Sequence, residues 1–266
     1  MTAETLTDDL DLIVEAAREA GALILERRAR GLSVEYKDNN SPVSDADLAA
    51  DALLTERLRT ARPDYGWLSE ETADDPERLA RRRIFLVDPI DGTRAYVKDK
   101  PWFTVCIAVV EDGAPVASVV FAPALDETFT ALAGGGAYLN GEPIRPSART
   151  DLDDALMVSE AALFTHSVWA TPWPPMRYQN RNSLAYRICL VACGAADAAI
   201  SWGGKRDWDL GAADLIAREA GAVICDWRGQ RYAYNRPDPT QSGLMAAAPG
   251  LAPLILEKTR LIERLR

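Results

Sequence analysis

Apolar residues recur at helical spacing through the first thirty or so positions of the chain. The spacing predicts a helix over 6–30, with Gly31 where that helix should stop. A second helix is predicted from Ser44 to about Thr60, and Ser44 stands three residues before Asp47, as in a capping box. The apolar positions of the first helix are Leu10, Ile13, Val14, Ala17, Ala20, Leu23 and Ile24.

Beyond residue 63 the pattern changes to short apolar runs, which predict strands. Asp112-Gly113 predicts a tight turn that joins two of these strands into a hairpin, and Asn140-Gly141 predicts another tight turn. The predicted strands of this part cover 66–68, 83–87, 103–110, 115–122 and 128–133.

After about residue 151, predicted strands alternate with predicted helices. This alternation is typical of an α/β arrangement. We therefore expect an N-terminal half, 1–150, with a helix pair and an antiparallel sheet, and a C-terminal α/β half, 151–266. The strands of the second half are expected at 155–159, 198–201 and 222–226, and its helices at 183–196 and 209–220.

The composition is that of a globular protein, with 48% hydrophobic and 26% charged residues among 266. A count of 30 basic and 40 acidic residues gives a net charge of −10. We do not expect such a chain to bind a nucleic acid polymer, because proteins that do so concentrate positive charge against the phosphates. A phosphorylated small molecule is not excluded, provided that a metal or local basic residues supply positive charge.

Neither a signal peptide nor a membrane span is expected. Residues 1–11 contain no basic n-region and no apolar h-region, and no run of about 18 apolar residues occurs in the chain. The cysteines form no C-x-x-C pair and are expected to be buried, reduced thiols, which favours a cytoplasmic protein. They are Cys106, Cys189, Cys193 and Cys225.

Most common catalytic groups are missing from the sequence. His166 is the only histidine, so neither a histidine-based triad nor a histidine zinc site is expected. The cysteines lack the spacing of a zinc site. What the chain does contain is carboxylates at the ends of apolar segments.

The densest group of carboxylates lies in segment 87–93. Asp88 ends an apolar strand, and Pro89 cannot donate to a continuing ladder, so we expect the backbone to turn there. The turn should free the Ile90 carbonyl and bring Asp91 near Asp88, giving a set of hard oxygens suited to Mg²⁺. Gly92 would allow close backbone approach, and Thr93 would offer a hydroxyl and an N–H to a phosphate. The alternative at this point is an ordinary turn with a strand-end cap.

Four further acidic residues also have both a functional and a structural interpretation. Glu70 and Glu71 follow the short apolar run 66–68, and they could be either metal ligands or a solvated loop. Asp209 precedes an apolar helix and Asp47 follows Ser44, so each could simply cap a helix, with an effect of about 1 kcal/mol. Four such positions beside one Asp-Gly-Thr turn favour a metal site.

Segments 88–93 and 208–214 resemble the two signature segments of the inositol monophosphatase superfamily. The resemblance spans most of the chain in the expected order. It implies a layered α/β sandwich of the sugar-phosphatase type, with the active site between the two halves, which together form one catalytic unit. The similar blocks also include 37–47, 69–71 and 134–141.

The resemblance also implies a role for each matching residue. The implied ligands of two or three Mg²⁺ ions are the carboxylates of Glu70, Asp88, Asp91 and Asp209 and the carbonyl of Ile90. Glu71 would contact a further metal or its water, while Asp47 and Thr93 would orient and deprotonate the attacking water. Substrate contacts are implied for Asp91, Gly92, Thr93, Lys37 and Ser183. This constellation implies a metal-dependent phosphatase that needs no histidine or cysteine nucleophile.

Details of the motifs bear on the substrate. Ser69 precedes the acidic pair where the family often has glycine, which is similar to the 3'(2'),5'-bisphosphate nucleotidase branch, as are 226–230 and 234–235. The resemblance therefore implies 3'-phosphoadenosine 5'-phosphate as substrate, with inositol 1-phosphate as the alternative and histidinol phosphate or fructose 1,6-bisphosphate less favoured. It also implies lithium inhibition and, as in many family members, a possible homodimer.

Two interpretations remain open from the sequence. The loop 166–181 could stack an adenine through Trp169, Trp173 or Tyr178, with Arg177 meeting a second phosphate, or it could be an ordinary aromatic surface or dimer loop. A non-catalytic metal or phosphate-binding module is the alternative to an enzyme. Such a module would be supported by mutated ligands, yet the five carboxylates are all present: Asp47, Glu70, Asp88, Asp91 and Asp209.

Overall fold

The computed structural model describes residues 3–31, 33–36 and 42–262. Helices α1 (Ala3–Arg30) and α2 (Asp45–Ala61) confirm the two predicted N-terminal helices. The predicted capping box is also confirmed, because Asp47 Oδ2 accepts hydrogen bonds from the Ser44 N–H at 2.8 Å and the Ser44 hydroxyl at 2.6 Å. A small antiparallel sheet of β1 (Val34–Tyr36) and β2 (Pro42–Ser44) lies between these helices in the chain.

A seven-stranded sheet follows, in the order β3-β4-β5-β6-β7-β8-β9. All of its neighbouring strands are antiparallel except β3 and β4. Helices α1 and α2 pack on one face through Phe85, Val87 and their neighbours, while Ile84 and Leu86 face the opposite core. The strands are β3 (Gly66–Ser69), β4 (Arg83–Asp91), β5 (Thr104–Glu111), β6 (Ala114–Ala122), β7 (Glu127–Leu132), β8 (Gly136–Leu139) and β9 (Glu142–Pro143).

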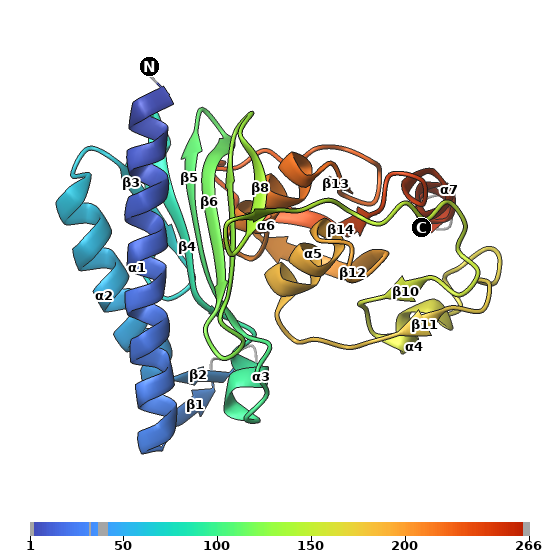
Figure 1. Cartoon of the computed structure of the whole chain (residues 1–266), viewed down its shortest axis with the longest axis horizontal. Coiled ribbons are helices and arrows are strands. Elements are labelled where there is room, and N and C mark those ends of the chain that lie inside the picture. Colours follow the sequence, from blue (N-terminus) through green and yellow to red (C-terminus); the bar gives the residue numbers. More distant parts are fainter. Residues whose placement is uncertain (1–2, 32, 37–41, 263–266) are drawn as a thin grey trace.

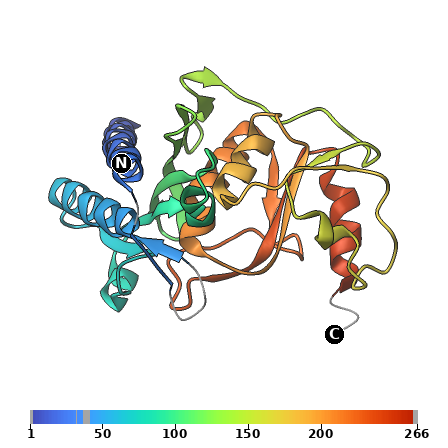
Figure 2. The same ribbon diagram turned by 90° about the horizontal axis from the view of Figure 1, so that it is seen from below.

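A five-stranded sheet forms the second part, in the order β11-β10-β12-β14-β13. Helices α5 (Leu184–Ala192) and α6 (Asp207–Ala220) lie between the two sheets, and α4 (Ala161–Phe164) and α7 (Ala252–Ile262) pack on the outer face (Figures 1 and 2). The molecule is therefore a layered sandwich of helices and sheets, as predicted. The strands are β10 (Leu156–Met157), β11 (Arg177–Tyr178), β12 (Ala198–Arg206), β13 (Val223–Cys225) and β14 (Thr240–Ala247).

The predicted turn at Pro89 is wrong. Strand β4 continues through Pro89 to Asp91, and its register against β5 shifts between the pairs Asp88–Cys106 and Asp91–Thr104. Three steps along β4 therefore oppose two along β5, which is a β-bulge. Since the bulge leaves one residue outside the ladder, a proline without an N–H is tolerated there.

Several element boundaries also differ from the sequence prediction. Helix α5 ends at Ala192 rather than 196, because Gly194 adopts a left-handed φ of 75°. Strand β12 runs on to Arg206 through a register shift between Ser201 and Gly204. Helix α6 begins at Asp207, two residues earlier than predicted.

The remaining short elements are η1 (Pro76–Ala80) and α3 (Thr93–Val97). A division of the chain near residue 150 stays a prediction; it falls in segment 144–155, which leads from the first sheet to the second. All four cysteines are free thiols, and three of them are buried. Within the described residues, no helix combines the length and the apolar character that crossing a membrane requires.

Candidate active site

Five elements meet at a polar pocket of about 290 Å³. Strands β3 and β4 end at it, and helices α3, α5 and α6 begin beside it. Because these segments are far apart in the sequence, only the folded chain assembles the pocket. Four of the predicted carboxylates lie on its wall: Glu70, Asp88, Asp91 and Asp209.

Three of these carboxylates form a compact group. Glu70, Asp88 and Asp209 each present one oxygen, and the three oxygens lie within 4.8 Å of one another. Asp88 is 1% exposed, and its Oδ1 has no hydrogen-bond partner among the described residues. A buried carboxylate oxygen without a donor is costly unless a cation satisfies it. The hard oxygen donors and the orphaned Oδ1 therefore fit a divalent cation such as Mg²⁺.

The electrostatics of the group agree with this interpretation. Burial, followed by the charges of Glu70 and Asp91, raises the pKa of Asp88 well above its ordinary value. Burial also raises the pKa of Asp209 to about 7, although the Arg206 N–H donates a hydrogen bond to its carboxylate at 2.8 Å. Repulsion among the three carboxylates disfavours their simultaneous ionisation, and a bound cation would relieve this repulsion.

Asp91 lies beside this group, and its carboxylate holds the start of α5. Its Oδ2 accepts hydrogen bonds from the Ser183 hydroxyl at 2.6 Å and the Ala185 N–H at 2.7 Å, and its Oδ1 accepts one from the Leu184 N–H at 3.1 Å. Ser183 is fully buried and also caps α5 by accepting from the Tyr186 N–H at 3.0 Å. The structure thus places Ser183 behind the pocket wall, where it positions Asp91.

Thr93 and Asp47 form a pair at the start of α3. Thr93 Oγ1 lies 3.1 Å from Asp47 Oδ1 and 3.0 Å from the Ile90 carbonyl oxygen. Burial raises the pKa of Asp47 despite the hydrogen bonds from Ser44, and the charge of Glu71 adds to this effect. A hydroxyl held against a carboxylate of raised pKa is suited to accept and pass on a proton.

Gly92 makes the corner between β4 and α3 possible. Its φ is 95°, and a Cβ at this position would come within about 3.0 Å of Ser183. A larger residue would therefore be strained and would push α5 away from Asp91. Gly92 and Thr93 both line the pocket, as predicted, whereas Glu71 lies near Asp47 outside its lining. Lys37, another predicted contact, lies outside the described residues.

Several pocket residues were not predicted from the sequence. Arg94 follows Thr93 directly, while the others come from three separate segments of the C-terminal half. Nothing in their local sequence distinguishes them from ordinary surface or helix residues. They are Arg94, Glu160, Asn182, Arg187, Ser201 and Lys205.

The aromatic loop 166–181 does not reach this pocket. Trp169 packs edge-on against Trp173, with ring centroids 4.9 Å apart. The ring centroids of Trp169 and Trp202 are 5.5 Å apart. Lys258 of α7 donates hydrogen bonds to Thr171 and to the carbonyl of Pro172 at 2.9 Å. No residue of 166–181 lines the pocket, so the structure favours the surface-loop interpretation over adenine stacking.

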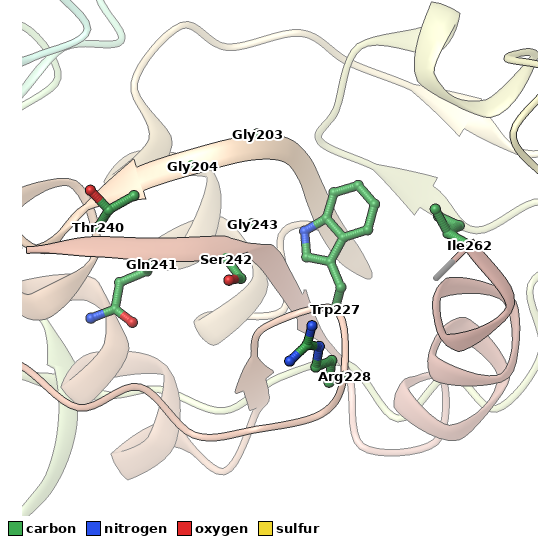
Figure 3. Close-up of a pocket in the computed structure, with 9 residues that line it drawn as sticks. All are labelled: Gly203, Gly204, Trp227, Arg228, Thr240, Gln241, Ser242, Gly243 and Ile262. Atoms are coloured by element: carbon green, nitrogen blue, oxygen red, sulfur yellow. The ribbon is translucent and has the colours of Figure 1, made fainter. Parts of the chain in front are cut away.

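A larger cavity of about 580 Å³ lies elsewhere, between β12, β14 and the end of α7 (Figure 3). Its walls are the glycines 203, 204 and 243, the Trp227 indole, the Arg228 side chain and polar side chains of β14. No carboxylate among the described residues lines it. The cluster of carboxylate oxygens described above therefore belongs to the smaller pocket.

Comparison with known proteins identifies the relatives of this chain. The model of the Inositol monophosphatase family matches residues 6–264. The chain is 35% identical over 230 residues to the Nus factor SuhB of Xylella fastidiosa, covering 83% of this chain and 82% of the relative. It is 32% identical over 237 residues to Inositol monophosphatase 2 of Solanum lycopersicum, covering 84% and 89%.

Two further matches concern the bisphosphate nucleotidase branch and the fold. The chain is 32% identical over 239 residues to the 3'(2'),5'-bisphosphate nucleotidase CysQ of Aggregatibacter actinomycetemcomitans, covering 84% of this chain and 86% of the relative. The fold is similar to the solved structure of an IMPase from Thermotoga maritima, with a TM-score of 0.84 and 26% identity. That match covers 97% of this chain and 99% of the other.

Proposed function

The chain belongs to the inositol monophosphatase family of metal-dependent phosphatases, and from that premise we propose that it hydrolyses a small phosphomonoester with Mg²⁺ in the carboxylate pocket. The observation that carries the proposal is the group of Glu70, Asp88 and Asp209, with the unsatisfied Oδ1 of buried Asp88. A binding module would not need a proton acceptor beside these ligands, whereas the Asp47 carboxylate, hydrogen-bonded to Thr93 on the pocket wall, is placed to serve as one.

The carboxylates and the Gly92–Thr93 corner have separate roles in this proposal. Glu70, Asp88 and Asp209 would hold two or three Mg²⁺ ions, together with Asp91 and the Ile90 carbonyl. When bound, such ions neutralise phosphate oxygens and make a nearby water more acidic. Backbone N–H groups of Gly92 and Thr93 would hold the phosphate.

Proton transfer is the task of the Asp47–Thr93 pair in this proposal. The Thr93 hydroxyl would donate to the carboxylate of Asp47 and accept a hydrogen bond from the attacking water. The proton of that water would then pass through the Thr93 oxygen to Asp47, whose raised pKa favours uptake. Glu71, close to Asp47, would contact a further ion or its water.

The substrate that we propose is 3'-phosphoadenosine 5'-phosphate. It is supported by the Ser69-Glu70-Glu71 motif, by segments 226–230 and 234–235, and by similarity to a relative named as a bisphosphate nucleotidase. Inositol 1-phosphate is the second candidate, because relatives of similar identity are named inositol monophosphatases.

The test is phosphate release from both esters in parallel, with Mg²⁺ and with or without lithium. A large preference for the nucleotide supports the proposed substrate, and a preference for the inositol ester supports the alternative. Asp88→Asn is the control, since it removes a central carboxylate. Mg²⁺ binding in calorimetry without turnover of any phosphomonoester would instead support the non-catalytic module.

A further inference from the structure

Arg187 of α5 is a buried cation that faces the active-site pocket. It is 7% exposed and lines the pocket together with the carboxylates. Its Nε donates to the carbonyl oxygen of Arg181, and its Nη2 donates to Asn180 Oδ1 at 2.9 Å. Both partners are uncharged, and no carboxylate of the described chain lies within ion-pair distance of this guanidinium.

Lys205 of β12 is a second cation on the lining of the same pocket. It is half-buried, and its ammonium group makes neither a hydrogen bond nor an ion pair with any residue that the structure describes. Burial lowers the pKa of Lys205, and the charge of Arg187 lowers it further. The two cations are therefore close enough to repel one another.

Carboxylates near these two cations attract them without forming ion pairs, and Asp209 acts on the pKa of Lys205 more strongly than Arg187 does. Asp91, Asp209 and Glu160 act on them from within the pocket, but none is within ion-pair distance. Asp91 is already held by α5, and Asp209 belongs to the proposed cation site. A buried cation without a paired anion is unfavourable, and two that repel one another are more so. An anion bound between them would pair with both cations and would offset their mutual repulsion.

We infer that Arg187 and Lys205 bind a second phosphate of the substrate, on the part of the molecule that leaves. The inference rests on the proposed function, in which the carboxylate side of the pocket and the Gly92–Thr93 corner take the phosphate to be cleaved. Guanidinium and ammonium groups are the side chains that bind phosphate most strongly in proteins. The substrate class is thus a bisphosphate, and these two residues select it over the corresponding monophosphate.

The test compares two matched esters, 3'-phosphoadenosine 5'-phosphate and adenosine 3'-monophosphate, which differ only in the second phosphate. The wild type should prefer the bisphosphate. Lys205→Met should lower kcat/KM for the bisphosphate about 10- to 100-fold, mainly through KM, and change the value for the monophosphate less than about twofold. Arg187→Lys, which keeps the charge of a buried site, should give a smaller loss of the same selectivity.

Lys98→Met is the matched control, because Lys98 is exposed and does not line the pocket. Equal losses for both esters, or a higher Mg²⁺ requirement in Lys205→Met, would assign Lys205 to the carboxylate group and overturn the inference. Equal turnover of the two esters by the wild type would overturn it as well.

The failure of the proposed function is distinguishable from the failure of this subsite. If no ester, including p-nitrophenyl phosphate, released phosphate with Mg²⁺, the proposed function would fall. Calorimetry with the same two adenosine esters would then decide the subsite. The subsite would be supported if the wild type bound the bisphosphate more tightly than the monophosphate and Lys205→Met bound the two equally. Equal binding of the two esters by the wild type would refute it.

Discussion

The Ser69 hydroxyl donates a 2.5 Å hydrogen bond to Asp51 Oδ1, and this bond ties the acidic loop to helix α2. Thr72 Oγ1 donates to the other oxygen of Asp51 at 2.6 Å. Asp51 therefore holds both ends of the segment that carries Glu70 and Glu71. The serine that stands here in place of the usual glycine therefore has a structural task, which is to fix the position of a proposed cation ligand.

Ser69→Ala should weaken this attachment. We expect the half-saturating Mg²⁺ concentration to rise about tenfold, as is typical when a group that orients a metal ligand is lost. Stability should fall by about 1 kcal/mol, the usual value of one hydrogen bond. Mg²⁺ titration of activity and chemical denaturation measure the two effects. Thr60→Ala, exposed on the same helix, is the control, and an unchanged Mg²⁺ requirement would contradict the role of Ser69.

Asp91→Asn and Asp88→Asn should both abolish turnover but affect stability in opposite directions. The amide at position 91 would turn a donor group toward the N–H and O–H groups at the start of α5, at a cost of about 1–3 kcal/mol. The amide at position 88 removes a buried charge that its neighbours repel. Thermal unfolding in EDTA should therefore show a lower Tm for the first variant and a higher Tm for the second.

Thr93→Ala should reduce kcat by about 10²–10⁴, the range for losing a positioned proton-transfer group. The Mg²⁺ requirement should stay near that of the wild type, because Thr93 lies beside the carboxylate group and not in it. Thr93→Ser keeps the hydroxyl and should recover most of the activity. A shift in Mg²⁺ affinity without a change in kcat would contradict the proposed role.

Mg²⁺ should stabilise the protein more at pH 8 than at pH 6. In the metal-free protein the pKa of Asp209 is raised to about 7 from an ordinary value of 3.8, chiefly by burial. The folded state thus holds a proton that the unfolded chain has lost, so metal-free stability falls as pH rises between about 4 and 7. Mg²⁺ binds the ionised form and offsets this loss.

Melting curves with EDTA and with Mg²⁺ across that range measure the effect. Asp209→Asn should flatten the pH dependence of the metal-free protein. A Mg²⁺-induced rise in Tm that is the same at every pH would show that Asp209 does not couple metal binding to proton release.

The sequence predicted those elements whose pattern is local. The helices 6–30 and 44–60 and five of the seven strands of the first sheet follow from periodicity, whereas β8 and β9 were not predicted. Strand β4 was cut short because a proline normally ends a ladder, and a bulge cannot be recognised from composition. Strand β14 has a polar start and contains Gly243, and α7 contains Pro253 in its first turn, where proline is tolerated. Neither was predicted.

The candidate site divides in the same way. Its carboxylates could be found because each stands in a short motif at the end of a strand or the start of a helix. Arg187 falls in the predicted helix 183–196, and Lys205 falls between the predicted strand 198–201 and the predicted helix 209–220, so neither position indicates a site. Only the packing of α5 beside β12 brings them to one pocket, and such tertiary proximity leaves no trace in local sequence.

The strand order β11-β10-β12-β14-β13 has a consequence for how the protein is made. The interior position beside β12 is filled by β14, which follows the other four strands of this sheet in the sequence, and Asp209 stands on a helix between the sheets. A nascent chain that ends before residue 240 therefore leaves edges of β12 and β13 unpaired. Assembly of the second sheet must therefore wait until β14 has been made, and a chain that stops before residue 240 would expose two unpaired edges and be prone to aggregation.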